Sequence, residues 1–128
     1  MAMEGVKHIR GAVRATASTN IAANLLACVG TTAGTMGLAG VSASAPVATH
    51  ITYDAVASGA EGDFYPLSSG DEILVKSSAA ITCGDLCKGA ASGEVAPEAD
   101  IDTLTANTIG TAISDGAGSS GLFWLLVR

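Results

Sequence analysis

The sequence predicts an all-β protein built from two similar halves. The apolar segments run for about four to seven residues between clusters of Gly, Asp, Ser and Asn, which is too short for typical helices. Related segments also recur about 60 residues apart along the 128-residue chain. Because one core usually serves about 100 to 200 residues, both halves are expected in a single β domain.

Short strands are predicted wherever an apolar segment lies between two turn signals. One of them, the strand 71–76, is expected to join two pseudo-repeats of about 21–67 and 81–127. For residues 98–106 the sequence is compatible with either an acidic loop or one helical turn. The full set of predicted strands is 23–29, 35–40, 47–53, 63–67, 71–76, 85–88, 94–97, 108–113 and 122–127.

The repeat is read from an ordered series of matches between the halves. Ile21 matches Ile81, and Leu26 matches Leu86, which places Asn24 and Gly84 at the same turn position. Both residue types tolerate a positive φ, so a shared tight turn is a physical reason for the match. Chance similarity in a chain rich in Ala and Gly is the alternative. Later matches predict structural turns at Gly34, Gly62, Gly84, Gly93 and Gly121.

The last segment, 122–127, is apolar at every position. Such a strand is expected either at the centre of a core, covered on both faces, or in an oligomer contact. The predicted core residues are Ile81, Leu86, Ile109, Phe123, Trp124 and Leu126.

Charge is distributed unevenly along the chain, whose formal net charge is −6. Residues 1–14 contain three of the six bases, residues 15–53 contain no charged side chain, and residues 54–128 contain eleven of the twelve acids. A basic N-terminal arm, 1–14, and an acidic β domain, 15–128, are therefore predicted. The balance disfavours nucleic-acid binding. The charge-free stretch indicates either protein contact or a solvated Ser/Thr-rich segment.

Membrane insertion and export are not expected. A spanning helix needs about 18 consecutive apolar residues, whereas the best run, 21–29, is interrupted by Asn24. Charges within residues 1–14 argue against an export signal, so maturation in a cytoplasm is expected. The three cysteines, Cys28, Cys83 and Cys87, are expected to be free thiols, because they form neither an even disulfide framework nor a zinc-ligand spacing.

No catalytic, cofactor-binding or metal site is predicted. Residues 116–121 match the GxGxxG string, but an apolar strand follows them where a dinucleotide-binding fold requires a helix. Nucleophilic catalysis needs a base beside a Cys or Ser, and the only histidines are His8 in the arm and His50 in a predicted strand. The chain is therefore expected not to be an enzyme.

The order of these features resembles the capsid decoration, or cement, proteins of tailed bacteriophages, over roughly residues 15–128. The segments that carry the resemblance are Ile-Thr-Cys-Gly-Asp-Leu-Cys at 81–87, Gly-Glu-Val-Ala-Pro at 93–97 and Ile-Gly-Thr-Ala at 109–112. The glycine-rich turn 116–121 and the closing apolar strand complete it.

The resemblance implies a compact β-barrel or β-sandwich with an extended N-terminal arm. It implies a virion protein on the capsid exterior that binds the major capsid protein and stabilises contacts between its subunits. Homo-oligomers, often trimers, are implied as well. The alternative is a carbohydrate- or cell-surface-binding β-sandwich module, which would need exposed aromatic rings. Candidate capsid contacts in the arm and the charge-free stretch are Lys7, His8, Arg10, Arg14, Asn20 and Asn24.

Overall fold

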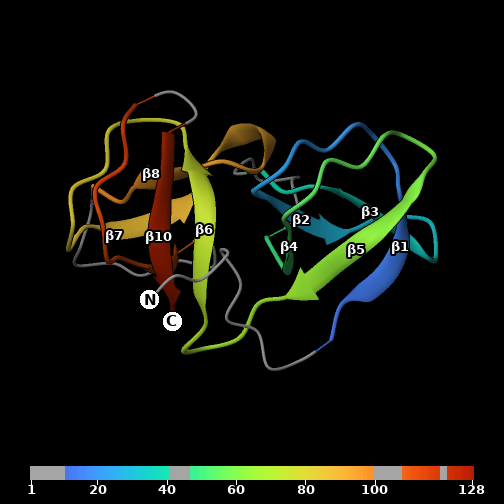
Figure 1. The fold of residues 1–128 in the computed structure, drawn as a ribbon, viewed down its shortest axis with the longest axis horizontal. Helices are drawn as coiled ribbons and strands as arrows, with labels where there is room; N and C mark the ends of the chain where they lie inside the picture. The colour runs from blue at the N-terminus through green and yellow to red at the C-terminus, as the bar shows by residue number, and fades with distance from the viewer. Residues whose placement is uncertain (1–10, 41–46, 100–107, 119–120) are drawn as a thin grey trace.

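The protein is almost entirely β-structure, folded as two closed barrels side by side (Figure 1). A computed structural model describes residues 11–40, 47–99, 108–118 and 121–128. The first barrel contains β1 (Val13–Ala17), β2 (Leu25–Val29), β3 (Thr35–Leu38), β4 (His50–Thr52) and β5 (Glu61–Pro66). The second contains β6 (Glu72–Ser77), β7 (Leu86–Gly89), the 3-10 turn η1 (Ala91–Gly93), β8 (Val95–Pro97), β9 (Thr108–Ala112) and β10 (Gly121–Val127).

Both barrels have the same topology, which confirms the prediction of an all-β fold from two pseudo-repeats. The strand order is β1-β3-β2-β4-β5 in the first barrel and β6-β8-β7-β9-β10 in the second. In each barrel the first and third strands pair in parallel, and the other pairings are antiparallel. Isolated bridges join Ile21 to Val56 and Ile81 to Gly116, at matching positions of the two halves.

Matching turns have matching backbone conformations. Asn24 and Gly84 have φ values of 64° and 98°, and Gly34 and Gly93 have values of 81° and 78°. Each of these residues lies in the left-handed region that the repeat predicts for a tight turn. No helix of the described ranges is long and apolar enough to cross a membrane.

The repeat unit is longer than the sequence indicates, because it includes a first strand in each barrel. Strand β6, predicted as a connection between the halves, pairs with β10 and β8 just as β1 pairs with β5 and β3. Strand β1 itself was not predicted. It includes Val13 and Arg14, two residues assigned to the arm, which pair with Phe64 and Asp63 of β5.

Gly62 and Gly121 lie in strands rather than in turns, and they are not equivalent to each other. Ala15 pairs with Gly62, whereas its counterpart Val75 pairs with Phe123. The last match between the halves is therefore shifted by two residues.

The equivalent positions of the two barrels are Gly62 with Val56 in the first and Phe123 with Gly116 in the second, so the large residue and the glycine have changed places. A Cβ atom on Gly62 would collide with the Val56 side chain. In the second barrel the glycine is at the other position, because a Cβ on Gly116 would lie 3.1 Å from Cβ of Phe123. Each barrel therefore fills the same space with one large residue and one glycine, as close packing requires.

The two barrels are joined by a shared apolar layer. Alternate residues of β2 point to opposite sides, so Leu25 and Ala27 fill the first barrel while Leu26 and Cys28 point outward. These outward side chains are buried all the same, because they pack with Ile51 into the core cluster of the second barrel. The chain therefore behaves as one packed body.

Hydrogen bonds reinforce this junction. Asn24 donates from Nδ2 to the Leu74 carbonyl over 2.9 Å, and its own carbonyl accepts the Lys76 N–H over 3.0 Å. On the other side of the junction, the Gly93 N–H donates to the Ala39 carbonyl over 2.8 Å. A Cβ on Gly93 would lie 2.6 Å from the Leu26 carbonyl oxygen, so only glycine permits this close approach.

Candidate interaction surface

The outer face of β10 exposes apolar side chains. Phe123, Leu125 and Val127 point into the second barrel, so the alternate residues of the strand point outward. Of these, Leu122 is 47% exposed and Leu126 is 38% exposed. Leu126 therefore does not belong to the core, contrary to prediction, because β10 is covered on one face only.

The other predicted core residues divide in the same way. Ile81, Ile109 and Phe123 are buried. Leu86 and Trp124 are only half-buried, since each lies on the outward side of its strand.

Residues on β6 and just after β9 extend this apolar surface on both sides of Trp124. Leu74 of β6 pairs with Trp124, and Ile113, which is 41% exposed, donates its N–H to the Trp124 carbonyl over 2.9 Å. Trp124 in turn donates its backbone N–H to Ser114 Oγ over 2.8 Å. We call this surface the outer β10 face. It consists of Leu74, Ile113, Leu122, Trp124 and Leu126.

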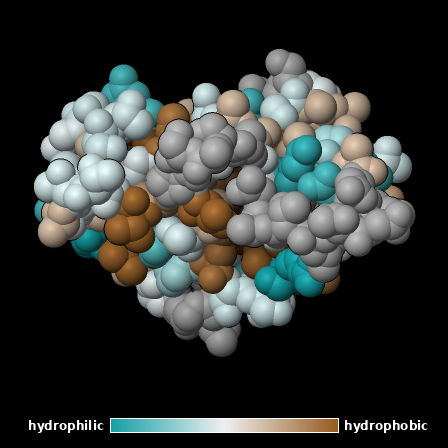
Figure 2. Space-filling view, turned by 180° about the vertical axis from the view of Figure 1, so that it is seen from behind, coloured by the Kyte–Doolittle hydropathy of each residue, from teal (hydrophilic) through white to brown (hydrophobic). Residues whose placement is uncertain are grey.

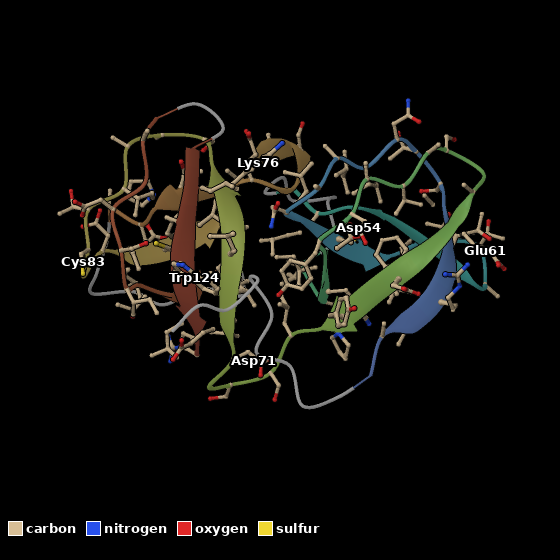
Figure 3. All side chains as sticks on the ribbon, in the orientation of Figure 1. Asp54, Glu61, Asp71, Lys76, Cys83 and Trp124 are labelled. Atoms are coloured by element: carbon tan, nitrogen blue, oxygen red, sulfur yellow. The ribbon has the colours of Figure 1, made fainter. Side chains whose placement is uncertain are left out.

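Two opposite charges border the outer β10 face on β6. Lys76 pairs with Leu122, and Glu72 pairs with Leu126, so the two charges lie at opposite ends of the surface. Figure 3 shows Trp124 on β10 and Lys76 at the far end of the neighbouring β6. An aromatic ring surrounded by aliphatic side chains, with charge at the border, is typical of a protein-binding surface.

Other exposed hydrophobic residues of the described chain are more dispersed. Val13, Val29 and Val47 are 43%, 57% and 38% exposed and lie on β1, on β2 and just before β4. Figure 2 shows that hydrophobic residues also gather near the middle of the opposite side of the molecule.

Three of the six candidate capsid contacts predicted from the sequence lie within the described residues. Lys7, His8 and Arg10 lie outside the described residues. Arg14 lies in β1, where its guanidinium is 3.1 Å from Asp63 Oδ1 and 3.7 Å from Glu61 Oε1.

The two candidate asparagines also have structural partners. Asn20 is exposed and accepts the Ser58 N–H over 2.9 Å. Asn24 joins the barrels instead of facing outward, because its side chain bonds to β6. No feature of the sequence indicates this role, since it depends on how the two halves pack.

The described side chains that could bind a metal or act as a nucleophile, acid or base are dispersed. No group of three His, Cys, Asp or Glu residues capable of holding a metal occurs in the described ranges. All three cysteines are free; Cys28 and Cys87 are buried and Cys83 is exposed. Burial raises the pKa of the Cys28 thiol and lowers the pKa of His50. Burial, with a smaller effect of Asp85, raises the pKa of Cys87 to about 12.

A shallow hollow of about 200 Å³ lies where the start of β4 and the loop after β5 meet β9 and the end of β10. Arg128 contributes its charged side chain, and the other lining residues are aliphatic or carry hydroxyl groups. A binding pocket for a small molecule normally brings several polar groups together. The lining is Val47, Ala48, Leu67, Ser68, Ser69, Thr108, Ile109, Val127 and Arg128.

The fold and this surface define the class of the chain as a tandem double-barrel β protein. No protein-family model matches the sequence, and no curated protein sequence matches it. A solved structure does match: the N base of the head fiber gp8.5 of bacteriophage phi29, with a TM-score of 0.69 and 19% sequence identity. The match covers 91% of this chain and 92% of the phage chain, so the two proteins share the whole fold.

Proposed function

We propose that the chain is a structural protein of a bacteriophage head. The observation that carries the proposal is the likeness to the phi29 head fiber base, which extends over both barrels and nearly the full length of each chain. A shared fold alone does not define a function. Here it agrees with an independent resemblance in the sequence to phage capsid decoration proteins.

The finer proposal is a decoration protein that binds the outer surface of an icosahedral head and stabilises contacts between major capsid protein subunits. Residues 15–53 carry no charged side chain, so they offer backbone and small side chains for close packing. The basic residues Lys7 and Arg10 precede the barrels and could contact an acidic capsid surface. Repetition over many lattice sites would make modest individual contacts strong in sum.

The proposal includes no catalytic step. His50, one of the two histidines in the chain, has its Nδ1 2.8 Å from Thr49 Oγ1. The cysteines Cys28 and Cys87 are held in their neutral form by burial. These features support a role in binding rather than in acid–base or nucleophilic chemistry.

The alternative, a carbohydrate-binding module, finds less support. Such a module stacks sugar rings on exposed aromatic side chains. Phe64 and Phe123 are fully buried, and Tyr53 and Tyr65 pack against the core with ring centroids 5.3 Å apart. Trp124 remains, half-buried between aliphatic neighbours.

Co-sedimentation tests the proposed function. Purified heads of the phage that encodes the chain, assembled without it, are mixed with the purified chain and pelleted. We expect saturable binding with a fixed number of chains per head. We also expect heads carrying the chain to resist heat or denaturant better than bare heads.

The control is the same chain unfolded and alkylated, which should stay in the supernatant. The absence of the folded chain from the pellet at every concentration would contradict the head-binding role. Specific binding to one class of sugars on a glycan array, with no head binding, would favour the carbohydrate-binding alternative.

A further inference from the structure

We propose that the hollow between the two barrels binds an acidic segment of a partner protein, in which an aliphatic residue adjoins a carboxylate. The hollow has a volume of about 200 Å³ and lies where the residues just before β4 and the loop after β5 meet β9 and the end of β10. Binding sites often lie where two folding units meet. That the partner is a head protein rests on the proposed function, whereas the chemistry of the segment follows from the lining residues.

The hollow is lined by equivalent positions of the two barrels. The Leu67 N–H donates to the Thr49 carbonyl over 3.0 Å, and the Arg128 N–H donates to the Ile109 carbonyl over 3.0 Å. Leu67 of the first barrel therefore corresponds to Arg128 of the second, and both line the hollow. The same end of each barrel thus contributes one wall.

The two walls differ in chemistry. On the side of the first barrel, Ala48 and Leu67 are aliphatic. The corresponding residues of the second barrel are Thr108, with a hydroxyl group, and Arg128, with a guanidinium. The serines at 68–69 add further hydroxyl groups. The hollow therefore suits a group that combines an aliphatic chain with an anion.

Arg128 supplies a positive charge that no described acidic side chain neutralises. Arg14 and Lys88 form ion pairs with neighbouring acids, but Arg128 forms none within the described ranges. The nearby loop carboxylate of Asp71 is buried, accepts the Ser68 N–H over 2.9 Å and does not line the hollow. A guanidinium presents several donors in one plane, which match the two oxygens of a carboxylate. This cation on a chain of net charge −6 therefore favours an acidic ligand.

The size and the open rim of the hollow favour a protein segment over a free small molecule. Pockets for drug-sized molecules usually measure about 300–1,000 Å³ and enclose most of the ligand. This hollow is smaller, and its lining includes the exposed residues Val47 and Arg128. It therefore suits one or two side chains of a segment whose backbone lies across the rim. Side chains anchored in such hollows provide much of the affinity of protein interfaces.

NMR titration of the full chain tests the inference, with the peptide acetyl-Ala-Leu-Glu-Ala-amide as the probe. The amide signals of Ser69, Ile109 and Arg128 should shift together, with a dissociation constant on the order of 1 mM. The same peptide with Gln in place of Glu should bind at least about fivefold more weakly, because it lacks the charge that the guanidinium recognises. A peptide with Ser in place of Leu should also bind more weakly, because it lacks the aliphatic group.

Substitutions in the chain assign these effects to the hollow. Arg128→Gln should reduce the affinity for the Glu peptide to that for the Gln peptide, and should leave the affinity for the Gln peptide unchanged. Val47→Ser, at an exposed position of the aliphatic side, should weaken both peptides. The matched control is Lys76→Gln, which removes another base that forms no ion pair with the described residues and should change neither affinity. The near-UV signal of Trp124 verifies that each variant is folded.

Three results would overturn the inference. The first is the absence of shifts at the hollow with the Glu peptide at about 20 mM, well above the expected dissociation constant. The second is equal binding of the Glu and Gln peptides. The third is tighter binding of free 4-methylpentanoate than of the Glu peptide, which would assign the hollow to a small carboxylic acid.

Co-sedimentation of Arg128→Gln with heads tests whether the segment belongs to a head protein. We expect weaker head binding than for the wild-type chain, and Lys76→Gln should bind heads as the wild-type chain does. Unchanged head binding by Arg128→Gln would overturn the assignment of the segment to the head. Because head binding of the wild-type chain is measured separately, failure of the hollow leaves the proposed function intact.

Discussion

Asn24 and Gly84 occupy the same turn position of the two barrels, but only Asn24 has a side chain that can bond to the other barrel. Its Nδ2 donates to the Leu74 carbonyl of β6 over 2.9 Å. The sequence predicts the turn at this position because both residue types tolerate a positive φ. It does not predict the hydrogen bond, which exists only after the barrels have packed together.

Replacing Asn24 separates the two contributions of this residue. Asn24→Gly removes the side-chain hydrogen bond but keeps the φ of 64°, and it should lower the free energy of unfolding by about 1 kcal/mol. Asn24→Ala also forces a Cβ-bearing residue without a stabilising side chain into the left-handed region, so its total loss should reach about 2 kcal/mol. Urea unfolding measures both values.

Asn20→Ala is the matched control for Asn24. It also removes a single hydrogen bond of an asparagine, to the Ser58 N–H, but at an exposed site away from the junction. Its effect should be smaller than that of either Asn24 variant, because water can replace an exposed hydrogen bond. Equal losses for Asn20→Ala and Asn24→Ala would contradict the role of Asn24 at the junction.

Cys87 makes the stability of the chain depend on alkaline pH. Burial, with a smaller effect of Asp85, raises its pKa to about 12 from a reference value of 9.0. The unfolded chain therefore loses this proton at a lower pH than the folded chain. Below pH 9 this thiol therefore does not lower the free energy of unfolding. As the pH rises from 9 toward 12, the free energy of unfolding falls, with a slope of up to about 1.4 kcal/mol per pH unit.

Urea unfolding between pH 8 and pH 10.5 measures this slope. Cys87→Ala should reduce the slope above pH 9, whereas Cys83→Ala, at an exposed thiol, should leave it unchanged. The remaining slope includes Tyr53 and Cys28, whose pKa values are also raised by burial. A wild-type slope that persists in full in Cys87→Ala would refute the assignment.

Among the elements, β2 to β10 overlap strands predicted from the sequence, whereas β1 was not predicted. The predicted strands have large apolar residues between turn signals. The side chains of β1 that face the barrel interior are Ala15 and Ala17, so the strand produces no apolar run. In the sequence, Arg14 also looks like part of the basic arm, but in the structure it forms an ion pair with Asp63 of β5.

The apolar pattern of β10 could not be interpreted from sequence for a related reason. Alternation distinguishes the two faces of a strand only when one face is polar. Residues 122–127 are apolar at every position, so the sequence could not show that Phe123 and Leu125 point inward while Leu122 and Leu126 point outward. The pairing of β10 with β6 and β9 decides this.

The position of β1 determines where the N-terminal segment can be removed without loss of the fold. Deleting residues 2–10 leaves β1 intact, so the free energy of unfolding should change by less than about 1 kcal/mol while head binding weakens. Deleting residues 2–14 also removes Val13 and Arg14 and their pairing with β5, and should therefore destabilise the first barrel.

Thermal unfolding and co-sedimentation measure both deletions. The variant lacking residues 2–10 isolates the effect of the basic segment from any effect on β1. Full head binding by this folded variant would contradict a role of Lys7, His8 and Arg10 in attachment. Unchanged stability of the variant lacking residues 2–14 would show that β1 contributes little to the barrel.

At the level of the whole molecule, two barrels with the same topology differ in their exposed outer surfaces. In the first barrel, Leu26 and Cys28 on the outer side of β2 are buried against the second barrel. The corresponding positions of β7 in the second barrel are Leu86 and Lys88, which are half-buried, and Lys88 lies 3.9 Å from Glu98. The duplication thus produced one surface that joins the halves and another that remains partly exposed.

The shared layer predicts that the two barrels unfold together. Leu26 belongs to a strand of the first barrel but lies in the core cluster of the second, and it is fully buried. Leu26→Ala should therefore destabilise the whole chain by about 3 kcal/mol, and a single transition should remain. The control is Val29→Ala on the same strand, which is 57% exposed and should change stability by less than about 0.5 kcal/mol.

Fluorescence and circular dichroism together test this coupling, because the single tryptophan, Trp124, reports only on the second barrel. Far-UV circular dichroism reports on both barrels. In Leu26→Ala the two probes should shift to the same lower urea midpoint, although the substitution lies in the first barrel. A circular dichroism transition that moves while the Trp124 midpoint stays at its wild-type value would show that the barrels are independent domains, and that the layer around Leu26 does not couple them.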